Sequence, residues 1–202
     1  MSRSVNVVAI LGSPRAPSYT RSLAVAVIRA LEARGAAVET LDLRATPLPP
    51  MSPELRAKRC EHPDPEAARL FRLAETADAY LLASPVYHNS YSGVLKNALD
   101  YLMLRDLRDR PVALASHGGR STQAVDPLRI AVRGLLGVAI PAQICTAVSD
   151  FSPEPDADGL YAVTDADIQA RIARQADELL LFAKHLGALR AEKAALRQTG
   201  SG

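Results

Sequence analysis

Hydrophobic and polar positions form two kinds of pattern that alternate along the chain. Residues 5–11 (VNVVAIL) are rich in β-branched side chains and almost entirely apolar, which predicts a strand buried on both faces of a parallel sheet. Residues 20–34 carry Leu23, Val27, Ile28 and Leu31 at helical spacing, and Gly35 follows where a helix C-terminus favours glycine. This first strand–helix pair sets the pattern for the rest of the chain.

Further strands are predicted over residues 38–43, 79–84, 111–116 and 143–148, and helices over 66–76, 93–105, 121–136 and 165 to about 197. The segment 46–65 is rich in proline and is predicted to be a long loop, as is the Pro- and Asp-rich segment 151–159. Five strands with helices between them indicate an α/β fold with a doubly wound parallel sheet. We expect one domain over residues 1–202, closed by the long C-terminal helix of about 165–197.

In such sheets ligands bind outside the carboxyl ends of the strands, so the loops that follow the strands are the candidate binding segments. The loop after the first strand, GSPRAPSYTRS, leads into a helix N-terminus, whose free N–H groups and partial positive charge attract anions. Its hydroxyls and guanidinium groups suit a phosphate monoester, and they belong to Ser13, Arg15, Ser18, Thr20, Arg21 and Ser22.

A simpler interpretation is that these serines and the threonine only cap the helix. The loop is not a Walker A motif, because no Gly-Lys-Ser/Thr ends it, and the Rossmann pattern G-x-G-x-x-G is absent. ATP hydrolysis and dinucleotide binding at this loop are therefore disfavoured.

The loop after the third strand is a compact polar turn, SPVYHNSYSG, that feeds the next helix. Its backbone N–H and C=O groups suit the polar edge of a flavin ring, and Tyr87 and Tyr91 offer flat contact area. Together, S-x-R-x-x-S after the first strand and S-P-x-Y-x-x-x-x-S-G-x-L-K-N-x-L-D from Ser84 resemble the NAD(P)H-dependent FMN reductase family. The resemblance covers roughly Val5 to Val148.

The resemblance implies a three-layer flavodoxin-like fold with strand order 2-1-3-4-5, FMN as cofactor and NADPH or NADH as co-substrate. It carries the phosphate role to the six residues of the first loop, and the ring-binding role to Pro85, Val86, Tyr87, His88, Asn89 and Ser92. Many relatives carry Glu at the position of Val86, where backbone contacts survive the change. Gly93 is expected at a close approach, and Lys96, Asn97 and Asp100 are expected to be structural.

The loop after the fourth strand, SHGGRS, allows its backbone to approach a ligand closely. By the resemblance it lies beside the pyrimidine end of the flavin. There the N–H groups of Gly118 and Gly119 would stabilise negative charge on reduced FMN, and His117 would add a hydrogen bond or a proton. The alternatives are an ordinary glycine turn and a histidine satisfied within its own loop.

No acid–base dyad is visible, and none is required, because the flavin carries the hydride chemistry. The predicted function is an enzyme that passes hydride from NAD(P)H to a small acceptor such as free flavin, a quinone or an azo compound. The alternative is a flavodoxin-like electron carrier reduced by a partner protein, although such carriers tend to be strongly acidic and this chain has a net charge of +2.

Composition limits the other partners. No run of Lys and Arg forms a stripe and aromatic residues make up only 4%, so neither nucleic acid nor a membrane surface is predicted. No transmembrane helix or signal peptide is expected, which leaves the cytoplasm as the default location, and Cys60 beside His62 falls short of a metal site. The family resemblance implies a homodimer or homotetramer, with contacts expected from the helices at 93–105 and 121–136, and a flavin-dependent monooxygenase as a partner.

Overall fold

The computed structural model describes residues 3–199. Within them strands and helices alternate as the pattern predicts. The elements are β1 (Asn6–Leu11), α1 (Tyr19–Glu32), β2 (Ala37–Asp42), α2 (Pro53–Arg56), the 3-10 turn η1 (Arg59–Glu61), α3 (Pro65–Thr76), β3 (Ala79–Pro85), α4 (Gly93–Tyr101), α5 (Leu104–Leu107), β4 (Pro111–His117), α6 (Val125–Gly134), β5 (Val138–Thr146), the 3-10 turn η2 (Val148–Asp150) and α7 (Ala166–Thr199).

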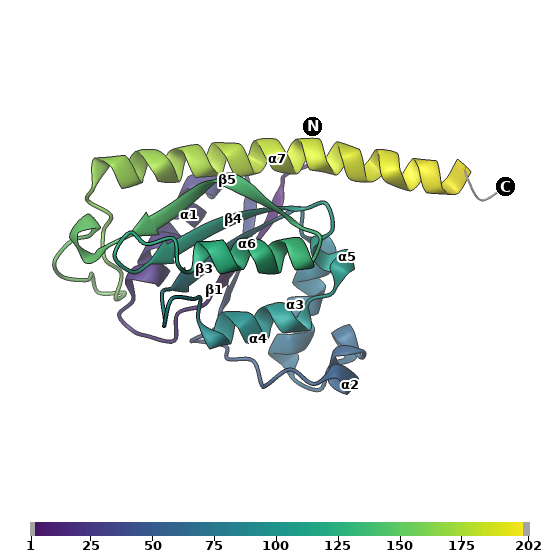
Figure 1. Cartoon of the computed structure of the whole chain (residues 1–202), viewed down its shortest axis with the longest axis horizontal. Coiled ribbons are helices and arrows are strands. Elements are labelled where there is room, and N and C mark those ends of the chain that lie inside the picture. Colours follow the sequence, from purple (N-terminus) through teal and green to yellow (C-terminus); the bar gives the residue numbers. More distant parts are fainter. Residues whose placement is uncertain (1–2, 200–202) are drawn as a thin grey trace.

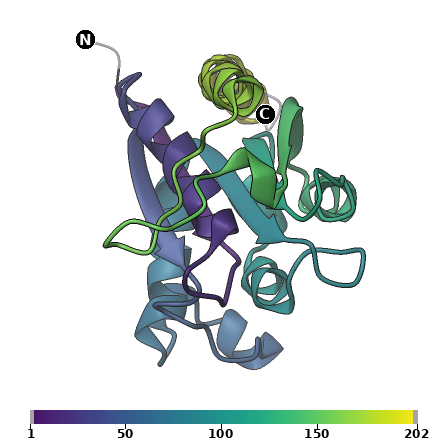
Figure 2. The same ribbon diagram turned by 90° about the vertical axis from the view of Figure 1, so that its left-hand side faces the viewer.

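The five strands form one parallel sheet in the order β2-β1-β3-β4-β5, which confirms the predicted three-layer flavodoxin-like fold. Helices α1 and α7 cover one face and α3, α4 and α6 cover the other (Figures 1 and 2). Val7 and Ala9 of β1 pack toward the first pair, and Val8 and Ile10 toward the second group. Both sides of β1 are therefore buried, which explains its unbroken apolar sequence.

The helix expected over 93–105 ends early and divides into α4 and α5. Leu102 and Met103 adopt extended backbone between them. The Asp106 carboxylate accepts a hydrogen bond from the Met103 N–H (2.8 Å) and pairs with Arg59 at 3.0 Å. Asp106 is thereby drawn into the protein, and the chain turns instead of continuing as one helix.

The fifth strand begins at Val138, five residues before the predicted start. The earlier start was not predicted because Pro141 argues against a strand: proline is tolerated in a sheet only at an edge or a bulge. β5 is the edge strand, and its pairing with β4 shifts register between Val112 and Leu114. The preceding helix α6 is shorter than the predicted 121–136, since residues 121–124 form a turn.

Side-chain hydrogen bonds hold the proline-rich segment 46–65 against α4: Tyr101 Oη donates to the Pro49 carbonyl (3.0 Å), Arg56 Nη1 donates to the Asp100 carbonyl (3.1 Å), and Asn97 makes others. Asn97 accepts a hydrogen bond from the Met51 N–H (2.9 Å) and donates one to the Pro49 carbonyl (2.8 Å). Lys96 pairs with Asp100 one turn along α4, at 2.7 Å. These contacts agree with the structural roles expected of Asn97, Lys96 and Asp100.

Helix α7 runs for 34 residues and is longer than the sheet it covers (Figure 1). Asp165 caps its start by accepting a hydrogen bond from the Ile168 N–H (2.9 Å). Ile172, Ala176 and Leu179 are buried against the sheet and α1, whereas the side chains of 191–197 are exposed. Across residues 3–199, no helix combines the length and apolarity needed to cross a bilayer.

Candidate functional site

A pocket of about 380 Å³ opens where the carboxyl ends of β1, β3 and β4 meet. The loop after β1 supplies most of its wall, and the loop after β5 contributes as well. Its lining residues are Ser13, Arg15, Ala16, Pro17, Ser18, Tyr19, Thr20, Pro85, His117, Val148 and Tyr161. The three loops chosen from the sequence therefore come together at the edge of the sheet where such folds bind ligands.

The loop after β1 is ordered by its own hydroxyl groups. Ser18 is the N-cap of α1: its Oγ accepts a hydrogen bond from the Arg21 N–H (3.2 Å) and donates one to Ser13 Oγ (2.7 Å). Among residues 3–199, no acceptor is found for the N–H groups of Tyr19 and Thr20. Two helix N-terminal donors are thus left for an anion, in addition to the partial charge of the helix end.

The two arginines of this loop differ in their surroundings. Arg15 is exposed on the pocket wall and makes no ion pair with any residue in the described range 3–199. Arg21 donates from Nε to Asp42 Oδ2 at 2.8 Å, which ties it to the end of β2. Arg15 is therefore the cation available to a bound anion.

Ser22 is buried one turn into α1 and lies outside the pocket lining. Its Oγ donates to the Ser18 carbonyl (2.9 Å) and accepts from the Tyr161 N–H (2.9 Å). Ser22 thus joins α1 to the loop after β5. Of the six residues predicted to hold the phosphate, Ser13, Arg15, Ser18 and Thr20 line the pocket, while Arg21 and Ser22 support the elements around it.

The turn after β3 is a two-residue hairpin. The N–H of Tyr87 donates to the Ser90 carbonyl (2.8 Å) and the N–H of Ser90 to the Tyr87 carbonyl (3.0 Å). His88 (φ 48°) and Asn89 (φ 62°) both have the left-handed backbone that a type I′ turn requires. No group within residues 3–199 accepts a hydrogen bond from the N–H groups of His88 and Asn89, so this exposed turn offers donors to a ligand.

Ser92 joins the loop after β3 to the loop after β1. Its buried Oγ donates to the Gly12 carbonyl (2.6 Å), and its N–H donates to Ser84 Oγ (2.9 Å). The close approach expected at Gly93 occurs at Gly12 instead: a Cβ on Gly12 would lie 2.7 Å from Leu95 Cβ, whereas nothing described lies within 4 Å of one on Gly93. Ser92 and Gly12 fix the spacing of the two loops behind the pocket.

The two glycines after β4, Gly118 and Gly119, differ in the hydrogen bonding of their N–H groups. The Gly118 N–H, expected to stabilise flavin charge, donates to the Thr146 carbonyl (2.9 Å) and is thus already bonded within the protein. A Cβ on Gly118 would lie 2.5 Å from Val86 Cβ, so glycine lets the β3 and β4 loops touch. The Gly119 N–H has no partner among residues 3–199 and remains a donor.

His117 is half-buried, and its ring stacks on Tyr19 with centroids 4.7 Å apart. Thr146 Oγ1 donates its hydrogen to the Ser116 carbonyl (3.1 Å) and therefore accepts from His117 Nδ1–H at 3.2 Å. This assignment leaves Nε2 as an acceptor in the neutral ring. Burial lowers the pKa of His117, although Asp150 opposes the shift, so the imidazole is uncharged at neutral pH.

Sequence reasoning missed the aromatic wall of the pocket. The ring of Tyr19 lies 4.0 Å from that of Tyr161 and 5.1 Å from that of Phe151, measured between centroids. Arg120 holds the loop that carries Phe151 and Tyr161 by pairing with Asp150 and, at 2.7 Å, with Asp165. No local motif marks these residues; the signal available was that β5 also ends at this edge of the sheet.

These groups fit a flavin mononucleotide. The α1 N-terminus, the pocket hydroxyls and Arg15 match a doubly charged phosphate monoester, and the unpaired N–H groups of His88, Asn89 and Gly119 match the polar edge of a ring. With the parallel sheet in the order 2-1-3-4-5, they are typical of a class: flavodoxin-like proteins, whose sheets bind ligands outside the carboxyl ends of the strands.

The chain belongs to the NADPH-dependent FMN reductase family, whose sequence model matches residues 5–151. It is 34% identical over 178 residues to an FMN-dependent NADPH-azoreductase of Staphylococcus saprophyticus, covering 87% of this chain and 94% of that protein. The enzyme of the same description from Staphylococcus aureus is 34% identical over 175 residues, covering 86% and 92%.

Solved structures agree with this family. An oxidoreductase from Corynebacterium diphtheriae is 26% identical and superposes with a TM-score of 0.65, over 91% of this chain and 99% of that one. A flavoenzyme NAD(P)H:(acceptor) oxidoreductase from Paracoccus denitrificans is 22% identical with a TM-score of 0.62, over 88% and 98%, and shares the fold.

The predicted enzyme class and cofactor are confirmed: the protein is an FMN-dependent oxidoreductase that takes hydride from NAD(P)H and reduces a small acceptor. The alternative of an electron carrier reduced by a partner protein receives no support, because the family and both relatives are reductases.

Proposed function

We propose that the pocket at the ends of β1, β3 and β4 holds FMN and that the reduced protein transfers electrons to a flat aromatic acceptor, an azo compound or a quinone. The observation that carries the proposal is one pocket lined by residues of all three loops, with the unpaired N–H groups of Tyr19 and Thr20 in its wall. The loops after β3 and β4 carry further unpaired N–H groups, on His88, Asn89 and Gly119. The proposed FMN-binding residues are Ser13, Arg15, Ser18, Thr20, Pro85, Val86, Tyr87, His88, Asn89, His117 and Gly119, with Arg21, Ser22, Ser92 and Gly118 supporting their positions.

Different groups of the chain bind the phosphate and the ring of FMN. Ser13, Thr20 and the α1 N-terminus donate to the phosphate oxygens, and Arg15 neutralises part of their charge. The hairpin N–H groups of His88 and Asn89 orient the ring edge. Bound FMN supplies the hydride chemistry, so the protein contributes orientation and electrostatics. The neutral ring of His117 adds an Nε2 acceptor for a hydrogen-bond donor on the ligand.

The acceptor class rests on the pocket wall and on the relatives. Tyr161, Tyr19 and His117 form one stack with Tyr19 in the middle, so the outer faces of Tyr161 and His117 remain for offset stacking with a flat ring. The relatives from both Staphylococcus species are described as azoreductases. A flat conjugated acceptor therefore suits this site better than a branched aliphatic one.

Two kinetic measurements test the function. In anaerobic stopped flow, NADPH or NADH should bleach the absorbance of the FMN-loaded protein, and the bleached protein should be reoxidised by an azo dye or a quinone. Tyr161→Leu should raise KM for these acceptors, whereas Tyr80→Phe, which changes a buried tyrosine outside the pocket lining, should leave KM unchanged. Failure of both nicotinamides to bleach the flavin refutes the proposal, and reoxidation by oxygen alone refutes the acceptor class.

We further propose that the protein forms a homodimer or homotetramer, with contacts through α4 and α6. Ile130 on α6 and Leu104 in the segment 93–105 are exposed large apolar side chains that such a contact would cover. Light scattering that shows a monomer at working concentration would contradict this. A flavin-dependent monooxygenase as recipient of reduced flavin is a separate proposal, tested by product formation in a coupled assay with that class of enzyme.

The location and domain organisation remain proposals as well. The thiols of Cys60 and Cys145 are free, as expected in a reducing compartment, and the cytoplasm is the proposed location. The described helices pack on the two faces of one sheet, which supports one FMN-binding domain for the chain. Fractionation of cell extracts tests the location. Limited proteolysis of the purified protein tests the single domain, which should not be cut into two stable fragments.

A further inference from the structure

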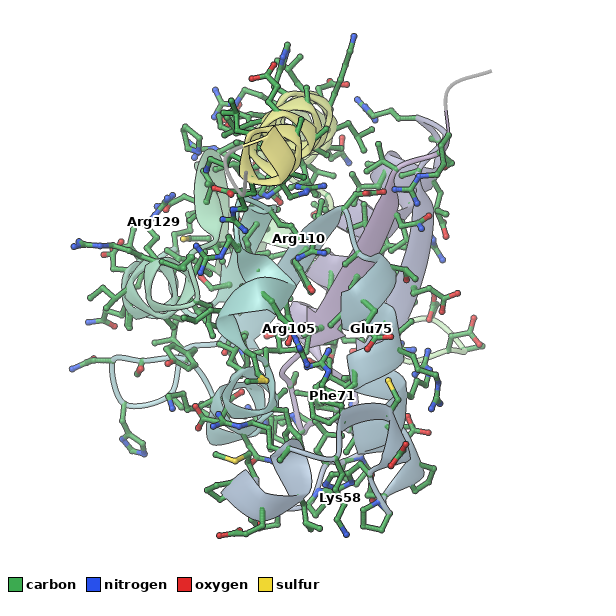
Figure 3. The ribbon with its side chains drawn as sticks, turned by 90° about the vertical axis from the view of Figure 1, so that its right-hand side faces the viewer. Lys58, Phe71, Glu75, Arg105, Arg110 and Arg129 are labelled. Atoms are coloured by element: carbon green, nitrogen blue, oxygen red, sulfur yellow. The ribbon has the colours of Figure 1, made fainter. Side chains whose placement is uncertain are left out.

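A second concave site lies at the opposite edge of the sheet, where β4 and β5 begin. Its volume is about 280 Å³, and it is formed by α5, the residues that follow it, and the projecting part of α7. Figure 3 looks onto this end of the molecule, with α7 pointing toward the viewer above α5, and labels Arg105 and Arg110. The seven residues of β4 separate it from the flavin pocket by about 23 Å at ~3.3 Å per residue.

The lining of this site is strongly cationic. Among the described residues, it contains six cationic side chains against one carboxylate and one alanine: Arg105, Arg108, Arg110, Arg190, Lys193, Arg197, Asp109 and Ala194. The whole chain is nearly balanced, with 24 Lys and Arg against 22 Asp and Glu. The fold therefore concentrates positive charge at one place that the sequence does not mark as basic.

Two features of the fold create this concentration. In the segment 105–110 (RDLRDR) acids alternate with arginines. However, Asp106 is only 2% exposed, and its carboxylate pairs with Arg59 at 3.0 Å. Arg105 and Arg108 remain exposed, and neither makes an ion pair with any residue in 3–199. Asp106, whose charge could balance these two arginines, points into the protein instead.

Helix α7 supplies the other wall. Arg190, Lys193 and Arg197 follow one another at intervals of three and four residues, so they lie on one face of the helix. Lys193 Nζ pairs with Asp109 Oδ1 at 2.8 Å, and Arg190 Nη1 donates to the Asp109 carbonyl at 2.8 Å. These bonds hold the helix face against the arginines of the α5 segment.

The local carboxylates neutralise only part of the site: Lys193 pairs with Asp109 at 2.8 Å and Arg190 with Asp78 at 3.7 Å. No carboxylate within residues 3–199 pairs with Arg105, Arg108 or Arg110. The guanidinium of Arg110 donates to the carbonyl oxygens of Ala77, Arg105 and Asp106, which are dipoles and carry no net charge. Burial and the neighbouring charge of Arg110 lower the pKa of Arg190, while Asp78 and Asp109 oppose the shift. Mutual repulsion of this kind is relieved by a bound anion.

We propose that this pocket binds a multivalent phosphate anion. Guanidinium groups match phosphate oxygens with paired N–H donors, and several such groups around one concave site suit two or three linked phosphates better than one. None of the described residues that line the pocket is aromatic, and its cations match the phosphoryl groups of a ligand. Inorganic tripolyphosphate, with three linked phosphates, should therefore bind at least as tightly as ADP, which has two.

The test is calorimetric titration of the FMN-saturated protein with tripolyphosphate and with ADP, at low and at physiological salt. Saturation with FMN is needed because the flavin phosphate site would otherwise compete for the probe. Wild-type protein should bind one equivalent. Arg108→Gln should weaken binding by about tenfold, as expected for loss of one charge-assisted hydrogen bond. Lys193→Gln should weaken it by less than about threefold, because the ammonium group is already paired with Asp109 at 2.8 Å.

Two matched variants serve as controls. Arg174→Gln removes the same charge from the same helix, 16 residues or about 24 Å from Arg190, and Lys184→Gln does so for a lysine. Both controls should bind tripolyphosphate as the wild type does, and Arg108→Gln should keep the wild-type rate of NADPH oxidation. Absence of saturable binding overturns the proposal, as does equal weakening in the control variants or binding of long nucleic acid without binding of tripolyphosphate.

Discussion

The contrast between Arg15 and Arg21 gives the sharpest prediction about FMN binding. The two arginines lie six residues apart in the same loop and helix start, and the sequence alone gives both the same role. In the structure Arg15 is exposed on the pocket wall, whereas Arg21 is committed to Asp42 at 2.8 Å. Replacing each with alanine removes the same charge from the same region, so the pair separates direct phosphate binding from general electrostatic attraction.

The expected magnitudes follow from the partners of each group. A charge-assisted hydrogen bond contributes about 1.5–3 kcal/mol, so Arg15→Ala should weaken FMN binding by roughly 10- to 150-fold. Ser13→Ala removes a neutral bond of about 1 kcal/mol, roughly a fivefold change. Arg21→Ala should change the dissociation constant by less than about threefold, because only the long-range, salt-screened part of its charge is lost.

The assay is quenching of FMN fluorescence on titration with the apoprotein, repeated at two salt concentrations. Thermal unfolding of each apoprotein is the control that separates loss of affinity from loss of fold. Equal dissociation constants for Arg15→Ala and Ser13→Ala would refute the reasoning. A larger effect from Arg21→Ala in a protein of unchanged thermal stability would refute it as well, since it would show that Asp42 releases Arg21 to the phosphate.

Three further predictions concern the supports of the site. Gly118→Ala places a Cβ 2.5 Å from Val86 Cβ and should cost about 1–3 kcal/mol of unfolding free energy by denaturant titration, while Gly93→Ala, in open space, should change it little. Asn97→Ala should cost about 1–3 kcal/mol and make segment 46–65 more sensitive to protease; Lys96→Ala, which breaks only an exposed pair, should cost less than about 0.5 kcal/mol. Burial of Asp150 opposes its ionisation, but hydrogen bonds from Arg120 and the Ala147 N–H prevail and lower its pKa. Its ionised form thus stabilises the fold above the ordinary Asp pKa of about 3.9, and this contribution is lost as pH falls through the lower, folded value. The difference in melting temperature between wild type and Asp150→Asn should therefore be largest near neutral pH and shrink below about pH 4; a constant difference would contradict this.

The three central strands β1, β3 and β4 were predictable because they are buried on both faces and are therefore apolar without alternation. Errors arose where a tertiary contact overrides a local pattern. Asp106 is pulled inward by Arg59 and interrupts a helix that the apolar spacing continues, and Pro141 is tolerated because β5 is an edge strand. Neither fact is visible before the elements are placed in space.

In the site, too, residues with local signals were predictable and residues with distant partners were not. The hydroxyls of the loop after β1 are local signals, and Ser13, Ser18 and Thr20 line the pocket as expected. Arg21 and Ser22 carry the same chemistry, but their partners, Asp42 and Tyr161, come from elements distant in sequence. Tyr161 belongs to a loop that no motif marks, so its stacking on Tyr19 follows only from the fold.

A crystal structure of the FMN-loaded protein tests the central claim most directly. The account predicts the phosphate at the N-terminus of α1, within hydrogen-bond distance of Arg15 and Thr20, and the ring edge against the N–H groups of His88, Asn89 and Gly119. Density that places the phosphate away from residues 13–20, or the ring away from the turns after β3 and β4, would contradict it.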